Sequence, residues 1–285
     1  MIKIIECPRD AMQGIKNFIP TEQKITYLNK LLKVGFDTLD FGSFVSPKAI
    51  PQMRDTADVL KGLDLDTTTK LLAIVANTRG AAQACEFEEI RYLGYPFSIS
   101  ETFQLRNTNA TIDDSLGRLM RIKELADQAG KEVVVYLSMG FGNPYGDLWN
   151  VDIVAHWVEQ LSQRGFSILQ LSDTIGVATP DSIAYLFSGL IPQYPNIEIG
   201  AHLHTKPNEW EAKIQAAYSN GCKRFDGAFK GYGGCPMAKD DLTGNMPTEQ
   251  ILHFFNNLNL LDSYQLDLAK SALDLSTSVY NYAEG

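Results

Sequence analysis

The first residues that could do chemistry lie near the start of the chain, where Arg9 and Asp10 follow the apolar run Ile2-Lys3-Ile4-Ile5-Glu6. Such a run is typical of a strand, so a permanent cation and a carboxylate would leave the end of that strand together. A pair of this kind can bind a metal ion and an anion, although in proteins at large it is more often a salt bridge. Partners elsewhere in the chain must decide between the two.

A second candidate site lies in His202-Leu203-His204, which closes another strand-like run. Residues two apart on a strand point to the same face, so this spacing brings two imidazoles to one point. Two of the four histidines of the chain stand here, and the pair favours a metal site over a structural histidine. With Asp10 the set is two histidines and one carboxylate, which suits Mg²⁺ or Mn²⁺ and could also hold Fe²⁺ or Zn²⁺.

The glycine-rich stretch 230–245 is the third candidate, because it contains Cys235 between two glycines and a proline. Its glycine spacing matches no phosphate-binding fingerprint. It predicts either a lid that carries a thiol to the site as a proton donor, or a surface turn with an incidental cysteine. Asn245 could supply a carbonyl oxygen to a metal ion or stabilise the turn. The remaining cysteines are expected only to pack: Cys7, Cys85 and Cys222.

The elements that must position these residues are short β-branched runs that alternate with helix-period segments, as in βα units. We expect strands near residues 2–6, 38–41, 71–75, 95–99, 132–138, 166–171, 197–202 and 224–228. Eight repeats predict an α/β fold, a closed (β/α)₈ TIM barrel, as a single catalytic domain over residues 1–285 with an extra C-terminal helix at about 261–283. Catalytic groups of such barrels lie at the carboxyl ends of strands, where Asp40 and Asp173 also fall.

Composition excludes several other classes of protein. Apolar residues make up 45% and charged residues 21%, as in soluble globular proteins, and the net charge of −9 argues against nucleic acid or an anionic membrane as a partner. No apolar run approaches the roughly 20 residues that span a bilayer, and no signal segment precedes the first strand, so a cytoplasmic location is predicted. The cysteines lack the spacing of a zinc ribbon or a disulfide scaffold.

Taken together, these motifs resemble the 3-hydroxy-3-methylglutaryl-CoA lyase family of the metal-dependent lyases with a TIM barrel. The resemblance covers nearly the whole chain. Its motifs are Pro8-Arg9-Asp10-x-x-Gln13, Ser43-Phe44-Val45-Ser46-Pro47-Lys48, Asp173-Thr174-Ile175-Gly176, His202-x-His204, Gly233-Gly234-Cys235-Pro236 and Gly244-Asn245. The Arg-Asp and His-x-His motifs are shared by the superfamily, whereas Ser-Phe-Val-Ser-Pro-Lys and Gly-Gly-Cys-Pro are closer to the lyase itself.

The resemblance implies a divalent cofactor, Mg²⁺ or Mn²⁺, and a retro-Claisen cleavage that gives acetyl-CoA and acetoacetate. The implied metal ligands are Asp10, His202, His204 and Asn245. The implied catalytic residues are Arg9 as enolate clamp, Asp173 as base with His202 as a possible partner, Cys235 as acid and Asp40 as a supporting acid. The implied substrate contacts are Arg9, Gln13, Ser43 and Lys48.

The partner implied by the resemblance is a small-molecule acyl-CoA, and a homodimer is plausible. Basic residues that could meet CoA are Lys16, Lys48, Arg54 and Lys206, none ranked above the others. The chain departs from the family in having Asp40 in place of a glutamate, Thr205-Lys206 after the second histidine, and a longer loop before Asn245. Two alternatives therefore stay open: a lyase or aldolase for another 3-hydroxyacyl-CoA or hydroxy acid, and a catalytically silent ligand-binding barrel.

Overall fold

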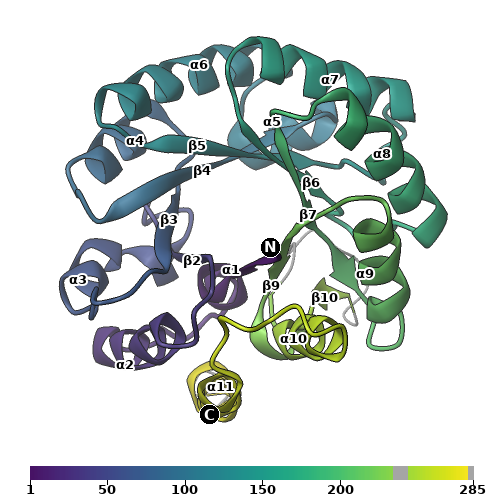
Figure 1. The fold of residues 1–285 in the computed structure, drawn as a ribbon. Coiled ribbons are helices and arrows are strands. Elements are labelled where there is room, and N and C mark those ends of the chain that lie inside the picture. The colour runs from purple at the N-terminus through teal and green to yellow at the C-terminus, as the bar shows by residue number, and fades with distance from the viewer. Residues whose placement is uncertain (234–242, 282–285) are drawn as a thin grey trace.

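Eight parallel strands close into a barrel, with helices around its outside (Figure 1). The structure is a computed structural model, which describes residues 1–233 and 243–281. The barrel strands follow one another around the ring in chain order, and the last pairs with the first. They are β1 (Lys3–Glu6), β2 (Thr38–Ser43), β3 (Lys70–Ile74), β4 (Ile90–Ser98), β5 (Glu132–Ser138), β6 (Ile168–Ser172), β7 (Glu198–His202) and β9 (Arg224–Gly227). The predicted α/β TIM barrel is confirmed.

The helices alternate with these strands, as βα units require. They are α1 (Pro8–Gln13), α2 (Thr21–Leu32), α3 (Thr56–Lys61), α4 (Thr78–Cys85), α5 (Glu101–Thr108), α6 (Ile112–Gln128), α7 (Val151–Gln163), α8 (Pro180–Gln193), α9 (Trp210–Ser219), α10 (Thr248–Asn257) and α11 (Leu266–Asn281), with 3₁₀ turns at Pro51–Met53 and Phe229–Gly231. The extra C-terminal helix is α11, which packs on α2 and α10.

Local sequence signals set several helix ends. The Thr111 hydroxyl accepts the N–H of Asp114 and begins α6, and Gly130, at φ +68°, follows its end. A capping box of Thr179 and Ser182 begins α8, with Pro180 at its first position. These signals fix where each helix starts relative to the strand before it, and so set the lengths of the loops at the barrel mouth.

Alternation along the strands separates two cores. On β5, Val133, Val135 and Leu137 belong to the large cluster between strands and helices, whereas Val134 and Tyr136 belong to a small second cluster. Side chains alternate between the two faces of a strand, so the second cluster fills the barrel interior. An inward-facing residue at the last position of a strand therefore points into the barrel mouth.

The structure corrects some expected boundaries. β4 begins at Ile90 rather than near residue 95, because the exposed Arg91, which pairs with Glu132 on β5, interrupts the apolar run without ending the strand. Directly after β4, the Ser100 hydroxyl accepts the N–H of Phe103 and begins α5. The C-terminal helix begins at Leu266, five residues later than expected.

A two-stranded antiparallel sheet lies beyond the end of β7. It joins β8 (His204–Thr205) to β10 (Gly244–Asn245), with Asn245 opposite His204. This pairing places two predicted metal ligands, His204 and Asn245, next to each other.

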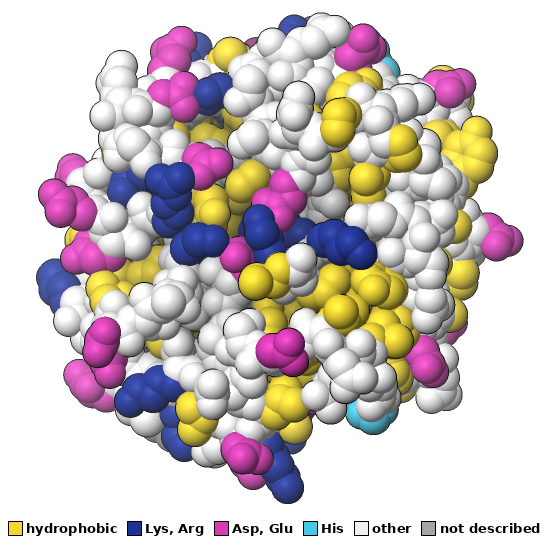
Figure 2. All heavy atoms as spheres, viewed as in Figure 1, with side chains coloured by type: hydrophobic (Ala, Val, Ile, Leu, Met, Phe, Trp, Pro, Cys, Tyr) yellow, Lys and Arg dark blue, Asp and Glu magenta, His cyan; other side chains and the backbone are white. Residues whose placement is uncertain are grey.

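The surface shows charges of both signs. In Figure 2, Lys and Arg side chains form a row near the middle of the face shown, with Asp and Glu side chains among them. Within the described parts of the chain, no helix is both long and apolar enough to cross a membrane.

Candidate metal and catalytic site

The structure brings three of the predicted metal ligands together at the barrel mouth. Asp10 in α1, His202 at the end of β7 and His204 in β8 each offer a ligand atom, and these atoms lie within 4.8 Å of one another. Their elements are far apart in sequence, yet the closed ring brings β1 and β7 to either side of β9. Two imidazoles and a carboxylate at this separation could hold a divalent ion.

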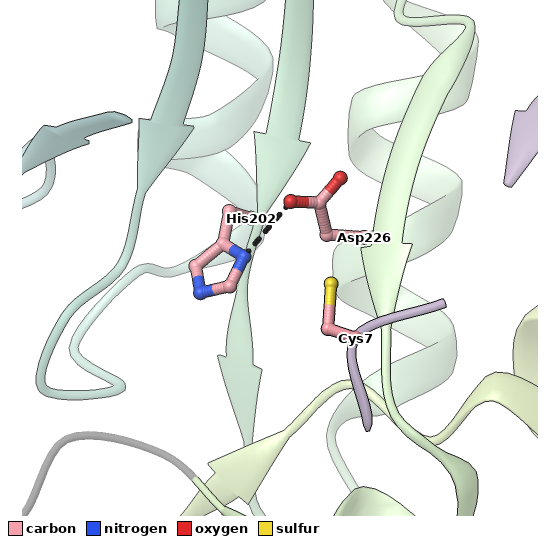
Figure 3. Close-up of side chains that lie close together, drawn as sticks. All are labelled: Cys7, His202 and Asp226. Atoms are coloured by element: carbon pink, nitrogen blue, oxygen red, sulfur yellow. Dashed lines mark hydrogen bonds and ion pairs between the residues drawn. The ribbon is translucent and has the colours of Figure 1, made fainter. Parts of the chain in front are cut away.

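His202 is oriented by a carboxylate that the sequence-based prediction did not include. Its Nδ1 lies 3.0 Å from Oδ2 of Asp226 on β9 (Figure 3). Burial lowers the pKa of His202, but the hydrogen bond and charge of Asp226 raise it by more, so the net shift is upward. A carboxylate of this kind draws the ring proton to Nδ1 and leaves the lone pair of Nε2 for a metal ion.

His204 supplies the strongest test of whether a metal fits here. Its Nδ1 lies 3.1 Å from the carbonyl oxygen of Thr174, which can only accept, so Nδ1 carries the proton. Its Nε2 is buried and has no hydrogen-bond partner among the described residues. An unsatisfied buried nitrogen costs about 1–3 kcal/mol, and a bound metal ion would satisfy it. Burial, with His202 nearby, lowers the pKa of His204 to about 4, so the imidazole is neutral at pH 7, as ligation requires.

Asp10 is ionised and firmly held. Its Oδ1 accepts from Arg9 at 2.9 Å and from Gln13 at 2.8 Å, and its Oδ2 accepts from the Asn245 amide at 2.6 Å. Burial raises the pKa of Asp10, but the charges of Arg9 and His202 lower it by more, to about 2. Asn245 thus reaches the site through its amide nitrogen, and the carbonyl oxygen that the prediction needs belongs to the same planar group.

Arg9 links Asp10 to Asp40. Its Nε and Nη2 donate to the Asp40 carboxylate, the shortest contact being 2.6 Å, while its Nη1 donates to Asp10 and to Gln13. Burial raises the pKa of Asp40 to about 6 against the lowering effect of Arg9, so the carboxylate is ionised at pH 7. The first interpretation, a salt bridge, is confirmed for Arg9, and its role as an active-site cation stays a prediction.

Asp173 occupies a more enclosed position than the base role suggests. Its Oδ1 accepts the backbone N–H groups of Val177 and Ala178 at 2.8 and 3.1 Å, and its Oδ2 accepts from Lys213 at 3.1 Å. Lys213 also donates to the carbonyl of His204 at 2.7 Å. Burial raises the pKa of Asp173, while Lys213 and the amides lower it by less. This pair therefore ties the loop after β6 to the second histidine.

The remaining predicted residues are spread more widely. Gln13 lies in the Arg9–Asp10 network, and Ser43 is buried at the end of β2, where its hydroxyl donates to the carbonyl of Ile74. Lys48 is exposed. Cys235 lies outside the described residues, and with it the expected lid, although the chain reaches the site just before it: a Cβ on Gly233 would lie 2.6 Å from the carbonyl oxygen of Asp10.

Sequence reasoning missed two residues of the site, Asp226 and Lys213. Asp226 could have been found, because it lies two residues after Arg224 on β9, the last strand of the barrel. Side chains alternate along a strand, so those of Arg224 and Asp226 both point into the barrel. Lys213 lies on α9, and the helical pattern gives no sign that its ammonium reaches back to a strand end.

A pocket of about 510 Å³ lies between the segments that follow β2 and β3 and is also lined by α3 and α4; among its described lining residues there is no predicted metal ligand. Ser43 and Phe44 line one side, and Asn77 and Arg79 the other, with Arg54 at its edge. The guanidinium of Arg54 stacks on the ring of Phe18 at 3.7 Å, which fixes one cation there. The pocket has the volume and the mixed lining of a ligand site.

Comparison with known proteins places the chain within a family. The HMGL-like family model matches residues 2–277. Hydroxymethylglutaryl-CoA lyase YngG of Bacillus subtilis is 34% identical over 265 residues, which are 93% of this chain and 88% of that protein.

Two further relatives differ in what their names record. The 3-hydroxy-3-isohexenylglutaryl-CoA/hydroxy-methylglutaryl-CoA lyase of Pseudomonas aeruginosa is 33% identical over 91% of this chain and 86% of its own length. The structure of an HMG-CoA lyase from Acinetobacter baumannii in complex with coenzyme A and 3-methylmalate has a TM-score of 0.90 at 28% identity, over 99% of this chain and 92% of that one.

Proposed function

The chain belongs to the HMGL-like family, and from that membership and its site we propose that it is a lyase that cleaves 3-hydroxy-3-methylglutaryl-CoA to acetyl-CoA and acetoacetate. The observation that carries the proposal is the convergence of metal-binding side chains at the mouth of the barrel. Asp10, His202 and His204 converge there, the Nε2 of His204 has no hydrogen-bond partner among the described residues, and Arg9 donates to Asp10.

Asp10, His202 and His204 would hold a divalent ion, Mg²⁺ or Mn²⁺, and the Asn245 carbonyl would join them if its amide turned. Bound there, the ion polarises substrate oxygens and lowers the free energy of the charge that develops on them. Asp226 and the Thr174 carbonyl set the ring protons of the two histidines, so that each Nε2 presents its lone pair.

Arg9 stabilises the developing enolate. When the carbon–carbon bond breaks, its electron pair moves onto the thioester carbonyl, and a fixed guanidinium at the mouth stabilises the negative oxygen. Asp40 keeps the guanidinium charged and immobile by gripping Nε and Nη2, which leaves Nη1 on the side of Asp10.

A base removes the proton of the substrate's tertiary hydroxyl group. The oxygen of that hydroxyl becomes the ketone oxygen of acetoacetate. Asp173 is our candidate: its Oδ2, bonded only to Lys213 among the described residues, keeps one lone pair for this proton. His202 is the alternative, since Asp226 stands behind it as an acceptor.

Cys235 returns a proton to the acetyl-CoA carbanion, a role that suits a thiol of ordinary pKa near 8.5. The support is the sequence motif together with the position of Gly233 against Asp10, since Cys235 itself lies outside the described residues.

The CoA portion of the substrate occupies the pocket between the β2 and β3 loops. Arg54 and Arg79 provide cations for its phosphates although the chain as a whole is acidic, and Ser43 connects the pocket to the strand that carries Asp40. Lys48 is exposed and does not line this pocket.

The test is product formation from a panel of thioesters by protein supplied with Mn²⁺. We expect acetyl-CoA and acetoacetate in equal amounts from 3-hydroxy-3-methylglutaryl-CoA. No cleavage by protein that binds Mn²⁺ would reject the substrate.

A second candidate has support of its own. One relative is named for an isohexenylglutaryl-CoA as well as for the methyl compound, and Asp40 is one methylene shorter than a glutamate. A lyase for a 3-hydroxyacyl-CoA with a longer branch would show a higher kcat/KM for that thioester in the same panel.

A further inference from the structure

Three inward-facing side chains meet directly beneath the proposed metal centre. Cys7 follows β1, His202 ends β7 and Asp226 lies on β9, and β9 stands between the other two strands in the ring. Figure 3 shows the thiol of Cys7 directed toward the His202–Asp226 hydrogen bond. The three ligand atoms lie within 4.8 Å of one another, and both Cys7 and Asp226 are buried.

We propose that Cys7, His202 and Asp226 form a second, inner site for a thiophilic dication such as Zn²⁺, and that its occupation excludes the ion needed for turnover. The chemistry of the set differs from that of the outer one. A thiolate, an imidazole and a carboxylate select Zn²⁺ or Co²⁺, whereas the outer set, without sulfur, also suits Mg²⁺ and Mn²⁺.

The spacing needs little adjustment to hold zinc. Bonds of about 2.0–2.1 Å to nitrogen and oxygen at a tetrahedral angle place those atoms about 3.3 Å apart. His202 Nδ1 and Asp226 Oδ2 are 3.0 Å apart. A zinc–sulfur bond of about 2.3 Å places sulfur about 3.6 Å from nitrogen, so the thiol must move by about 1.2 Å or less.

Charge favours a dication at this position. Asp10, Asp40 and Asp226 contribute three carboxylates. Arg9 pairs with the first two, and the buried Arg224 lies two residues from Asp226 on the same strand and interacts with its charge. Three carboxylates and two guanidinium groups leave a net charge of −1. The thiolate that Cys7 forms on binding makes it −2, which one dication neutralises. Gln170 donates to Oδ1 of Asp226 and leaves Oδ2 directed at His202.

His202 makes the two sites mutually exclusive. For the outer ion its proton lies on Nδ1, toward Asp226, and Nε2 accepts the metal. For the inner ion Nδ1 accepts the metal, the ring proton moves to Nε2 and blocks ligation there, and the thiol of Cys7 releases its proton to solvent. Zinc bound inside therefore deprives the outer centre of one of its two imidazole ligands.

The inhibitory consequence rests on the proposed function, but the binding does not. We therefore begin with Co²⁺ absorption of the purified protein, which reports a thiolate–cobalt bond without any substrate. The wild type is expected to show the thiolate-to-cobalt charge-transfer band. Cys7→Ser and Cys7→Ala should both lose it, whereas the matched control Cys222→Ser, another buried cysteine, should keep it.

Cys235→Ser separates the inner site from the thiol proposed as the proton donor, and it should keep the band. A wild type without the band, or a band lost in Cys235→Ser and kept in Cys7→Ser, would overturn the proposal, and the first of these needs no variant to fold.

The second measurement is Zn²⁺ inhibition of Mn²⁺-supported cleavage, each variant being compared with its own uninhibited rate. Cys7→Ser should need at least about tenfold more Zn²⁺ for half-inhibition, and Cys222→Ser should match the wild type. Equal inhibition of all three would reject exclusivity. A cobalt band that depends on Cys7 in a protein that cleaves no thioester would reject the proposed function and leave the inner site standing.

Discussion

Two buried carboxylate–cation pairs flank the barrel mouth, and they serve different ends. On the β1–β2 side, Arg9 grips Asp40 with two nitrogens and still directs Nη1 to Asp10. On the β6–β7 side, Lys213 divides its ammonium between Asp173 and the carbonyl of His204, and Asp173 further accepts two backbone amides. The side chain of Arg9 is 9% exposed, whereas that of Lys213 is 2% exposed.

Both pairs consist of a carboxylate and a cation, yet the geometry of the cation suits one to catalysis and the other to structural support. A guanidinium offers five donors in a planar fork, so it can be held from one side and act on the other. An ammonium that already bonds two acceptors in a closed space does little but hold them. We therefore assign a catalytic role to Arg9 of the first pair and a structural role to Lys213 of the second.

The largest effect should come from Arg9→Met. Removal of the enolate clamp should lower kcat by about 10²–10³-fold. It also leaves Asp10 and Asp40 without their cation, which should lower the free energy of unfolding by about 3–5 kcal/mol. Steady-state cleavage and urea unfolding measure the two effects.

Arg9→Lys is the matched control, because it keeps the charge and loses the fork. It should recover most of the stability and little of kcat. Full activity in Arg9→Lys would show that charge alone suffices and would remove the distinction between the two pairs.

Asp173→Asn should lower the free energy of unfolding by about 3 kcal/mol, since it leaves the Lys213 ammonium buried beside a neutral amide. Adding Lys213→Met should restore part of that loss, because the uncompensated charge is gone. Chemical denaturation of the two single variants and the double variant measures this coupling.

The same double variant tests the base. If Asp173 takes the hydroxyl proton, the variant stays inactive even where its fold is restored. Recovered turnover would assign the proton to His202 and leave Asp173 as a purely structural partner of Lys213.

Asp226→Asn should weaken Mn²⁺ binding by about 10–100-fold, because an amide no longer fixes the ring proton of His202. Isothermal titration of metal-free protein measures the affinity. His204 is held by a backbone carbonyl and offers no equivalent substitution. An unchanged Mn²⁺ affinity in Asp226→Asn would mean that the barrel, and not Asp226, orients His202.

The smallest effect concerns CoA. Arg79→Gln should raise KM for the thioester about fivefold with kcat retained, as expected for a partly solvated contact to phosphate worth about 1 kcal/mol. The matched control Lys48→Gln should change KM by less than about twofold. A larger effect at Lys48 than at Arg79 would move the CoA site away from this pocket.

Much of this architecture could be predicted from sequence because its signals are local. Strand and helix periods, caps and the His-x-His spacing each follow from a few neighbouring residues, and the eight-fold repeat leaves one simple closure. β4 was expected five residues late, because one exposed arginine interrupted its apolar run.

The contacts within the site were harder to predict from the sequence, because they depend on the register between strands that are distant in the chain. Asp226 meets His202 only once β7 and β9 are neighbours, and Lys213 reaches Asp173 from a helix 40 residues away. For the same reason Cys7 was expected only to pack, although closure of the ring brings it beneath His202.

The most direct test of the central claim is acetoacetate formation from 3-hydroxy-3-methylglutaryl-CoA by chelator-treated protein, with and without added Mn²⁺, for wild type and His204→Ala. We predict no product without metal, restoration by Mn²⁺ in the wild type and little or none in His204→Ala. Equal turnover by the metal-free wild type, or full restoration in His204→Ala, would contradict the assignment of this site.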